Sequence, residues 1–296
     1  MKSRVDGVLL LDKPPGVSSN AVLQRAKRLF DAAKAGHTGT LDPLASGLLP
    51  VCFGEATKFA QALLDSRKEY LATVRFGLAT STGDADGEVI GEAPAQFETQ
   101  DLAQALTAFI GVSQQVPPAY SALKFRGRNH YEYARAGIEV PRPPRPVHVD
   151  RLDLVERSGD RAVLRVGCGK GTYVRTLVED VAKSLGTLGH LTALRRLATG
   201  SFHIEQAHAL PEIEAMSPDH RRTLLLPIDA PVADLPALTL DPDAAQAIRH
   251  GREVSHATAV SGRLRAYAPE HQFIGLVDAS DGVLRAARLV AFAVES

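Results

Sequence analysis

The chain has 296 residues, of which 45% are hydrophobic, and its 34 basic and 34 acidic side chains give a formal net charge of +0. A chain of this length buries roughly three quarters of its unfolded surface, enough for one large domain and a small one. The charge balance argues against a protein built to coat nucleic acid, and no apolar run reaches the ~18 residues that a membrane span needs. We therefore expect a globular, cytoplasmic protein with no membrane partner.

The first 65 residues frame a loop rich in glycine and threonine. Residues 8–11 are all valine or leucine and predict a buried strand, which ends at Pro14-Pro15-Gly16. Ser18 or Ser19 then caps a helix whose apolar residues recur with a period of 3.6. The loop covers residues 35–47, and an apolar strand at residues 48–53 and a helix through residue 64 follow it. Packed elements thus anchor the loop on both sides.

The following residues predict a sheet that is largely antiparallel. Residues 70–76 alternate as a strand does, and residues 147–155 and 162–168 read as paired strands around a turn at Ser158-Gly159. A helix is expected from about Tyr173 to Leu185, and no regular βαβ alternation is present. This pattern favours an α+β catalytic domain at residues 1–230. Short strand-like runs after Pro231 predict a small β-rich domain at residues 231–296.

Positive charge is densest between residues 124 and 151. Aromatic side chains alternate with basic ones there, as expected where a protein meets phosphates and unstacked bases, although a solvated face is an equal alternative for this stretch alone. The basic residues are Lys124, Arg126, Arg128, Arg135, Arg142, Arg145 and Arg151, and the aromatic ones are Phe125, Tyr131 and Tyr133.

Asp42 is the main candidate for chemistry. It lies between Leu41 and Pro43, so a proline-fixed backbone holds its carboxylate. Alone, this aspartate is better explained as a turn or cap residue. Arg175 follows a glycine-rich segment at a helix start and is suited to keep a carboxylate ionised, with a surface ion pair as the alternative. The two cysteines lack metal-ligand spacing, and no cofactor-binding motif is present, so neither a metal nor a cofactor is expected.

The run from Gly36 to Pro50, GHTGTLDPLASGLLP, resembles the catalytic motif of the bacterial TruB-type tRNA pseudouridine-55 synthases. Three other segments agree, and the resemblance covers residues 5–205 in order. It implies the pseudouridine synthase fold and a C-terminal PUA-like RNA-binding domain. It also implies that a tRNA uridine, at position 55 of the T loop, is flipped out of its stack and isomerised.

The resemblance assigns roles residue by residue. Asp42 is the essential carboxylate, Arg175 is its partner, and Tyr70 lies against the target base and is a candidate proton acceptor. His37, Tyr173 and Leu194 line the RNA pocket, although the residues alone favour a solvated histidine and ordinary core positions for Tyr70 and Leu194. The expected RNA contacts also include Lys13, which is a candidate brace for the loop, and Lys124, Arg126 and Arg128.

Three other functions fit part of the pattern. A non-catalytic RNA-binding or tRNA-folding module would use the same basic surface, and a folding activity is compatible with catalysis. A guide-RNA-dependent pseudouridine synthase shares the catalytic motif but works in a ribonucleoprotein. A small-molecule enzyme built on Asp42 and Arg175 would leave the basic and aromatic stretch unexplained. The first expectation remains a monomer that acts on the T arm of tRNA without a guide RNA.

Overall fold

A computed structural model describes residues 4–256 and 260–291 of the chain. Across these residues, ten strands form one large sheet in the order β14-β1-β3-β12-β4-β11-β10-β7, with β2 paired to β3 and β13 paired to β12. The bounds are β1 (Gly7–Lys13), β2 (Ala35–His37), β3 (Ser46–Phe53), β4 (Lys68–Phe76), β7 (Gly111–Gln115), β10 (Arg145–Ser158), β11 (Arg161–Cys168), β12 (Gly189–Thr199), β13 (Phe202–His203) and β14 (His208–Ala209).

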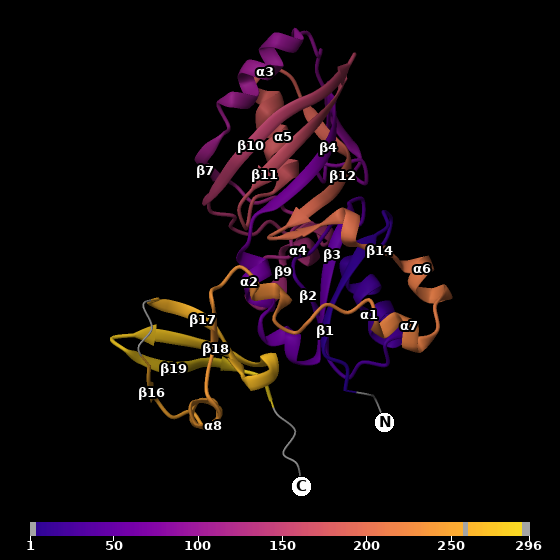
Figure 1. Ribbon diagram of the computed structural model, residues 1–296. Coiled ribbons are helices and arrows are strands. Elements are labelled where there is room, and N and C mark those ends of the chain that lie inside the picture. The colour runs from indigo at the N-terminus through magenta and orange to yellow at the C-terminus, as the bar shows by residue number, and fades with distance from the viewer. Residues whose placement is uncertain (1–3, 257–259, 292–296) are drawn as a thin grey trace.

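Most strand pairs in this sheet are antiparallel. The exceptions are β1 with β14 and β3 with β12, which run parallel. β12 lies between β3 and β4 and therefore joins the half of the sheet formed by β1, β2 and β3 to the half formed by β4, β11, β10 and β7 (Figure 1). The predicted mixed, largely antiparallel α+β domain is confirmed.

Helix α5 (Val174–Ser184) packs across the strands of the second half (Figure 1). Val174, Leu177, Val178 and Val181 recur at the spacing that puts them on one face, and this face is buried in a core with residues of β4, β11 and β12. Each such side chain contributes about 1.5–3 kcal/mol on burial. The first turn of α5 is thus held firmly against the sheet.

Helix α1 (Ser19–Leu29) covers the first half of the sheet. Ser18 is its N-cap and accepts a hydrogen bond from the Ala21 amide, while Val22, Leu23 and Ala26 pack on β1 and β3. The helix expected up to residue 64 is instead a 3-10 helix, Gly54–Lys58, followed by α2 (Ala60–Asp65). The break comes at Phe59, whose φ of −109° departs from helical geometry.

Gly47 allows β3 to approach β12 closely. Its φ is +102°, and a Cβ at this position would lie 2.3 Å from the Arg196 carbonyl oxygen. Only glycine combines this backbone conformation with the missing side chain. The close approach matters because β3 follows directly after the loop that carries Asp42.

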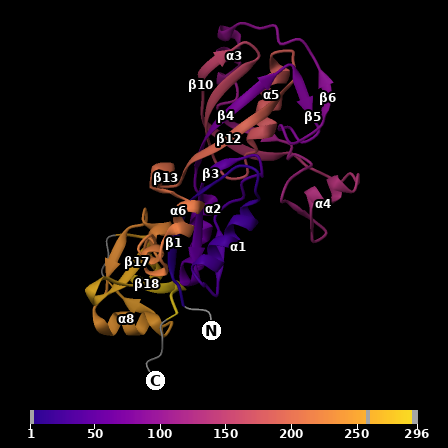
Figure 2. The same ribbon diagram turned by 90° about the vertical axis from the view of Figure 1, so that its right-hand side faces the viewer.

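The remaining elements of the large domain are mostly peripheral. They include the hairpin β5 (Leu78–Thr80) and β6 (Val89–Glu92), and the helices α3 (Thr99–Thr107), α6 (Leu210–Ala215) and α7 (Pro218–Arg222). A second hairpin, β8 (Lys124–Phe125) and β9 (Arg128–Asn129), leads into α4 (His130–Arg135). Figure 2 shows α4 in a lobe that stands away from the body of the domain.

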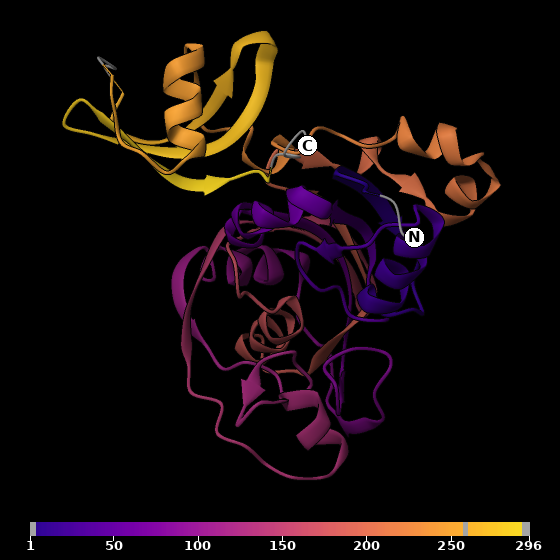
Figure 3. The same cartoon turned by 90° about the horizontal axis from the view of Figure 1, so that it is seen from below.

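The C-terminal part forms a separate β-rich domain, as predicted. Its sheet has the order β15-β17-β18-β19-β16, and helix α8 (Pro242–Arg249) lies across it (Figure 3). The strands are β15 (Ala237–Thr239), β16 (Val254–Ser255), β17 (Gly262–Ala268), β18 (Gln272–Ser280) and β19 (Val283–Leu289). A small apolar cluster that includes Phe59, Val232 and Leu276 connects this domain to the large one.

The boundary expected between residues 230 and 231 falls within a 3-10 helix, Ala230–Val232. Val232 belongs to the apolar cluster that includes Phe59 of the large domain and Leu276 of the small one. The boundary itself stays a prediction.

Candidate active site

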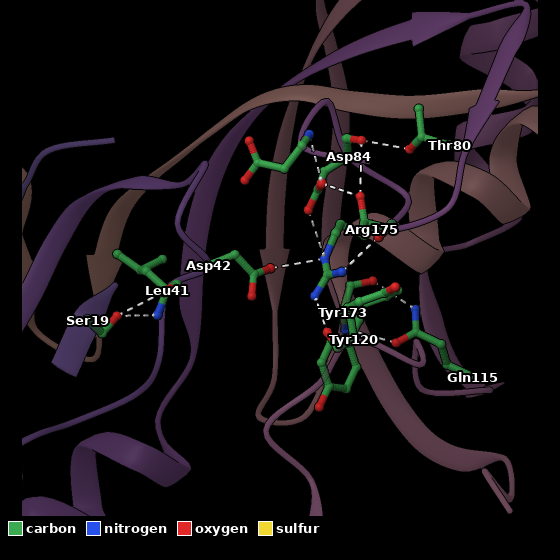
Figure 4. A network of polar contacts seen from close by, with 11 residues as sticks. Ser19, Leu41, Asp42, Thr80, Asp84, Gln115, Tyr120, Tyr173 and Arg175 are labelled. Atoms are coloured by element: carbon green, nitrogen blue, oxygen red, sulfur yellow. Dashed lines mark hydrogen bonds and ion pairs between the residues drawn. The ribbon is translucent and has the colours of Figure 1, made fainter. Parts of the chain in front are cut away.

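The loop that carries Asp42 connects β2 to β3 and is held by a buried serine. Ser19 Oγ donates a hydrogen bond to the Leu41 carbonyl at 2.9 Å and accepts one from the Leu41 amide at 2.8 Å (Figure 4). Ser19 lies in the first turn of α1 and is buried. Helix α1 therefore fixes the backbone of the residue that precedes Asp42.

Lys13 braces the same loop from its other end. Its ammonium donates to the carbonyls of Pro14 at 2.9 Å, Pro43 at 3.4 Å and Ala45 at 2.6 Å, and the residue is 0% exposed. Burial lowers the pKa of Lys13 to about 8, and Asp42 opposes this shift. The structure argues against the phosphate contact expected at Lys13, because the ammonium is buried and its three protons face backbone oxygens. The bracing role agrees with these contacts.

Asp42 forms an ion pair with Arg175, the second residue of α5. The distance from Asp42 Oδ2 to Arg175 Nε is 3.0 Å, and the side chains are 37% and 5% exposed, respectively. Arg175 Nη1 donates to the Thr82 carbonyl at 2.8 Å, and Nη2 donates to the Tyr120 carbonyl at 2.7 Å (Figure 4). The guanidinium is therefore fixed, while the Asp42 carboxylate remains partly open to the pocket.

Asp84 is a second carboxylate on the same guanidinium. Its Oδ2 lies 3.6 Å from Arg175 Nε, and it accepts hydrogen bonds from the Thr82 hydroxyl at 2.5 Å and the Asp86 amide at 3.2 Å. Burial raises the pKa of Asp42, Arg175 opposes this rise, and Asp84 adds to it. Arg175 thus favours the ionised Asp42 that nucleophilic attack requires.

A pocket of about 320 Å³ opens beside this ion pair. Its lining includes Asp42, Tyr70, Tyr173, Arg175, Leu194 and Arg196. The structure therefore brings together five of the residues expected at the site, from the loop, β4, the start of α5 and β12. A buried Gln115 holds the start of α5, since it accepts from the Tyr173 amide at 2.8 Å and donates to the Tyr173 carbonyl at 3.1 Å.

The two tyrosines present partly buried rings to the pocket. Burial raises the pKa of Tyr70, whereas the positive charge of the neighbouring Arg196 guanidinium lowers it. Burial also raises the pKa of Tyr173, and the charge of Arg175 opposes the rise. Both rings are thus phenols that need a specific partner before they ionise at neutral pH.

The other expected RNA-binding residues lie outside the pocket lining. His37 ends β2 and is half-buried, with its Nδ1 enclosed. Lys124, Arg126 and Arg128 lie on the β8–β9 hairpin, which adjoins the pocket residues Ser121, Ala122 and Leu123. Arg126 stacks on Phe125 and Arg128 on Tyr133, at 5.3 Å from each ring centroid. These pairs present an ordered basic surface next to the pocket.

Ser19, Asp84, Gln115 and Arg196 were not among the residues expected at the site. Their sequence signals point elsewhere: Ser19 adjoins the N-cap Ser18, and Asp84 lies in a turn-rich segment. Within the described residues, no group of three or more His, Cys, Asp or Glu side chains is arranged to hold a metal ion. No helix in the described part of the chain has the length and apolarity to cross a membrane.

Family models match almost the whole chain. The TruB family pseudouridylate synthase N-terminal domain matches residues 27–174, the tRNA pseudouridylate synthase B C-terminal domain matches residues 175–233, and the C-terminal domain of pseudouridine synthase II TruB matches residues 236–290.

Relatives and solved structures agree with these matches. A tRNA pseudouridine synthase B of Thiobacillus denitrificans is 52% identical, covering 98% of this chain and 97% of that protein. Another, of Aromatoleum aromaticum, is 51% identical and covers 97% of this chain and 93% of that protein. A chain in the crystal structure of a Cbf5-Nop10-Gar1 complex is 27% identical with a TM-score of 0.71, covering 97% of this chain and 84% of that one. The chain belongs to the TruB family of pseudouridylate synthases.

Proposed function

We propose that this protein is a tRNA pseudouridine synthase that converts uridine 55 of the T loop to pseudouridine. The observation that carries the proposal is the Asp42–Arg175 ion pair at the mouth of a pocket walled by Tyr70, Tyr173 and Leu194. Relatives that are about half identical over nearly their full length are named tRNA pseudouridine synthase B, which supports the substrate class.

The reaction breaks the bond from ribose C1′ to uracil N1 and rejoins the base through C5. The Asp42 carboxylate attacks C1′ of the ribose or C6 of the base as a nucleophile, or it acts as the base in an elimination that forms a glycal. Arg175 holds this charge in place, and its other nitrogens are already engaged by backbone carbonyls. Tyr70 accepts the proton that leaves C5 in each of these routes.

The target base must leave its stack to reach Asp42, which costs a few kcal/mol. At about 320 Å³, the pocket is at the small end of ligand sites and suits a single base. Tyr70 and Leu194 lie on β4 and β12, which are neighbouring strands, so an aromatic face and an aliphatic wall enclose the base. His37 fills the gap that the base leaves behind in the RNA.

The T arm is held mainly through its phosphates and shape. The hairpin residues Lys124, Arg126 and Arg128 adjoin the pocket mouth and form the main basic contact. We further propose that the protein acts as a cytoplasmic monomer without a guide RNA and that the same surface assists tRNA folding. The relatives named for tRNA are about twice as similar in sequence as the chain from the Cbf5-Nop10-Gar1 complex.

The test is incubation of the purified protein with an unmodified tRNA transcript, without guide RNA, followed by mapping of pseudouridine at each position. We expect conversion at position 55 alone, and none with Asp42→Asn, which still binds the tRNA. Asp86→Asn is the matched control, because it makes the same chemical change at an exposed aspartate that does not line the pocket. Binding without conversion by the wild type would instead favour a folding module or a guide-dependent enzyme.

A further inference from the structure

Arg196 is a fully buried arginine where β12 joins the two halves of the large sheet. It pairs with Tyr70 of β4 on one side and with Gly47 of β3 on the other. Its side chain is 1% exposed and lines the same pocket as Asp42 and Tyr70. One guanidinium therefore lies between the catalytic loop and Tyr70.

The hydrogen bonds of Arg196 hold both ends of the catalytic loop. Nε donates to the Leu48 carbonyl at 2.7 Å, and Nη2 donates to the Gly39 carbonyl at 3.1 Å. Gly39 and Leu48 lie on either side of Asp42 in sequence, and Arg196 is the cross-strand partner of Tyr70 on β4. Arg196 thus holds both ends of the loop directly beside Tyr70.

The charge of Arg196 is not neutralised by a carboxylate. Among residues 4–256 and 260–291, no carboxylate oxygen lies within 4.0 Å of its nitrogens, whereas Arg175 has both Asp42 and Asp84. A buried cation without an anionic partner is unfavourable for stability. Its positive charge is therefore available to an anion that forms inside the pocket.

We propose that Arg196 is a positioning residue for the reaction, which orients Tyr70 and stabilises its phenolate. The proposal rests on the proposed function, in which Tyr70 receives the proton from C5. In that step the C5–H bond breaks, its electron pair forms the C5–C6 double bond, and the pair of the N1–C6 double bond moves to N1. The proton goes to the phenolate oxygen, and the resulting phenol gives a proton to N1, so no other reactant is needed.

Among the charged and titratable groups around Tyr70, Arg196 is the one that favours ionisation of the phenol. Burial raises the pKa of Tyr70, and Cys168 from β11 and Asp42 from the loop raise it further, while Arg196 lowers it. Lys68, two residues before Tyr70 on β4, directs its ammonium to the carbonyls of Leu63, Leu64 and Ser66.

Arg196→Lys tests the proposal, with Arg195→Lys as the matched control. Arg195 is the adjacent residue on β12, but its guanidinium is partly exposed and pairs with Asp12. The readouts are the tRNA dissociation constant and the single-turnover rate of tritium release from tRNA labelled at uridine C5. We expect Arg196→Lys to be roughly 100-fold slower, with tRNA affinity unchanged and the pH–rate profile displaced to higher pH. Arg195→Lys is expected to match the wild type.

A double variant separates action through Tyr70 from general loop support. In a Tyr70→Phe background, Arg196→Lys should cause little further loss, because the group through which it acts is gone. An equal loss in both backgrounds, or a rate for Arg196→Lys equal to that of Arg195→Lys, overturns the proposal. Absence of conversion by the wild type would refute the proposed function itself, so the two failures are distinguishable.

A second measurement applies where Arg196→Lys does not fold. 3-Fluorotyrosine at position 70, in the otherwise unchanged chain, makes the phenol more acidic while keeping its shape. The pH–rate profile should then move to lower pH. A profile that does not move shows that ionisation of Tyr70 beside Arg196 plays no part in the rate, and the proposal fails.

Discussion

Replacement of Ser19 by alanine should separate the position of Asp42 from the chemistry of Asp42. The change removes both hydrogen bonds to Leu41 and leaves a buried amide and a buried carbonyl without partners. Each unpaired group costs about 1–3 kcal/mol, so the free energy of unfolding should fall by roughly 2–6 kcal/mol. If the same energy is lost in the transition state, single-turnover conversion slows by at least about 30-fold and at most about 25,000-fold.

Ser18→Ala is the matched control for this prediction. Ser18 is exposed and caps α1 through a 3.2 Å bond from the Ala21 amide, so its loss should lower the unfolding free energy by about 1 kcal/mol without affecting the rate. Both variants are measured by chemical denaturation and by single-turnover conversion of a tRNA transcript. A Ser19→Ala protein that is destabilised yet as fast as Ser18→Ala would show that the loop is positioned without the serine.

Three further predictions concern Gly47, Lys13 and the basic β8–β9 hairpin. Gly47→Ala should unfold the protein or lower its melting temperature sharply, because the new Cβ would meet the Arg196 carbonyl. In the control variant Gly16→Ala the new Cβ meets nothing within 4 Å and should cost about 1 kcal/mol, so equal melting temperatures for the two variants would contradict this prediction. Lys13 has a pKa of about 8 when folded and 10.5 when unfolded, so the unfolded state binds more protons between these values and stability rises with pH there. Lys13→Met should lessen that rise in denaturation curves, and an unchanged slope would refute the assignment. Neutralising Lys124, Arg126 and Arg128 together should weaken tRNA binding and reduce its salt dependence by about 2 logarithmic units per tenfold change in salt; an unchanged slope would place the phosphate contacts elsewhere.

The sequence predicts the local elements better than their arrangement. The helix expected from about Tyr173 to Leu185 and the strands expected to pair around Ser158-Gly159 are confirmed as α5 and the β10–β11 hairpin. The position of β12 between β3 and β4 could not be predicted, because the local sequence pattern of a strand does not show which other strands it pairs with. The helix after β3 was only partly right, since the chain turns at Phe59.

The same limit applies to the site. The residues around Asp42 and Arg175 have a distinctive local pattern, and the ion pair between them is present. Asp84 reads as part of a turn, and nothing in the local sequence distinguishes Arg196 from Arg195. Their burial arises only from contacts between distant segments, which one sequence does not reveal. Lys13 was expected at the RNA surface for the same reason, because nothing in its neighbourhood shows that three carbonyls surround it.

The central place of β12 also sets the order in which a working enzyme appears during synthesis. A nascent chain that has reached residue 188 already contains the whole catalytic loop, Tyr70 and Arg175, but β3 and β4 each lack the neighbour that joins them. Until residues 189–199 leave the ribosome, β4 and the first residues of β3 have an unpaired edge, which is prone to mispairing and aggregation. Insertion of one late strand then closes the sheet, so we expect the pocket to appear in a single step near the end of translation of this domain.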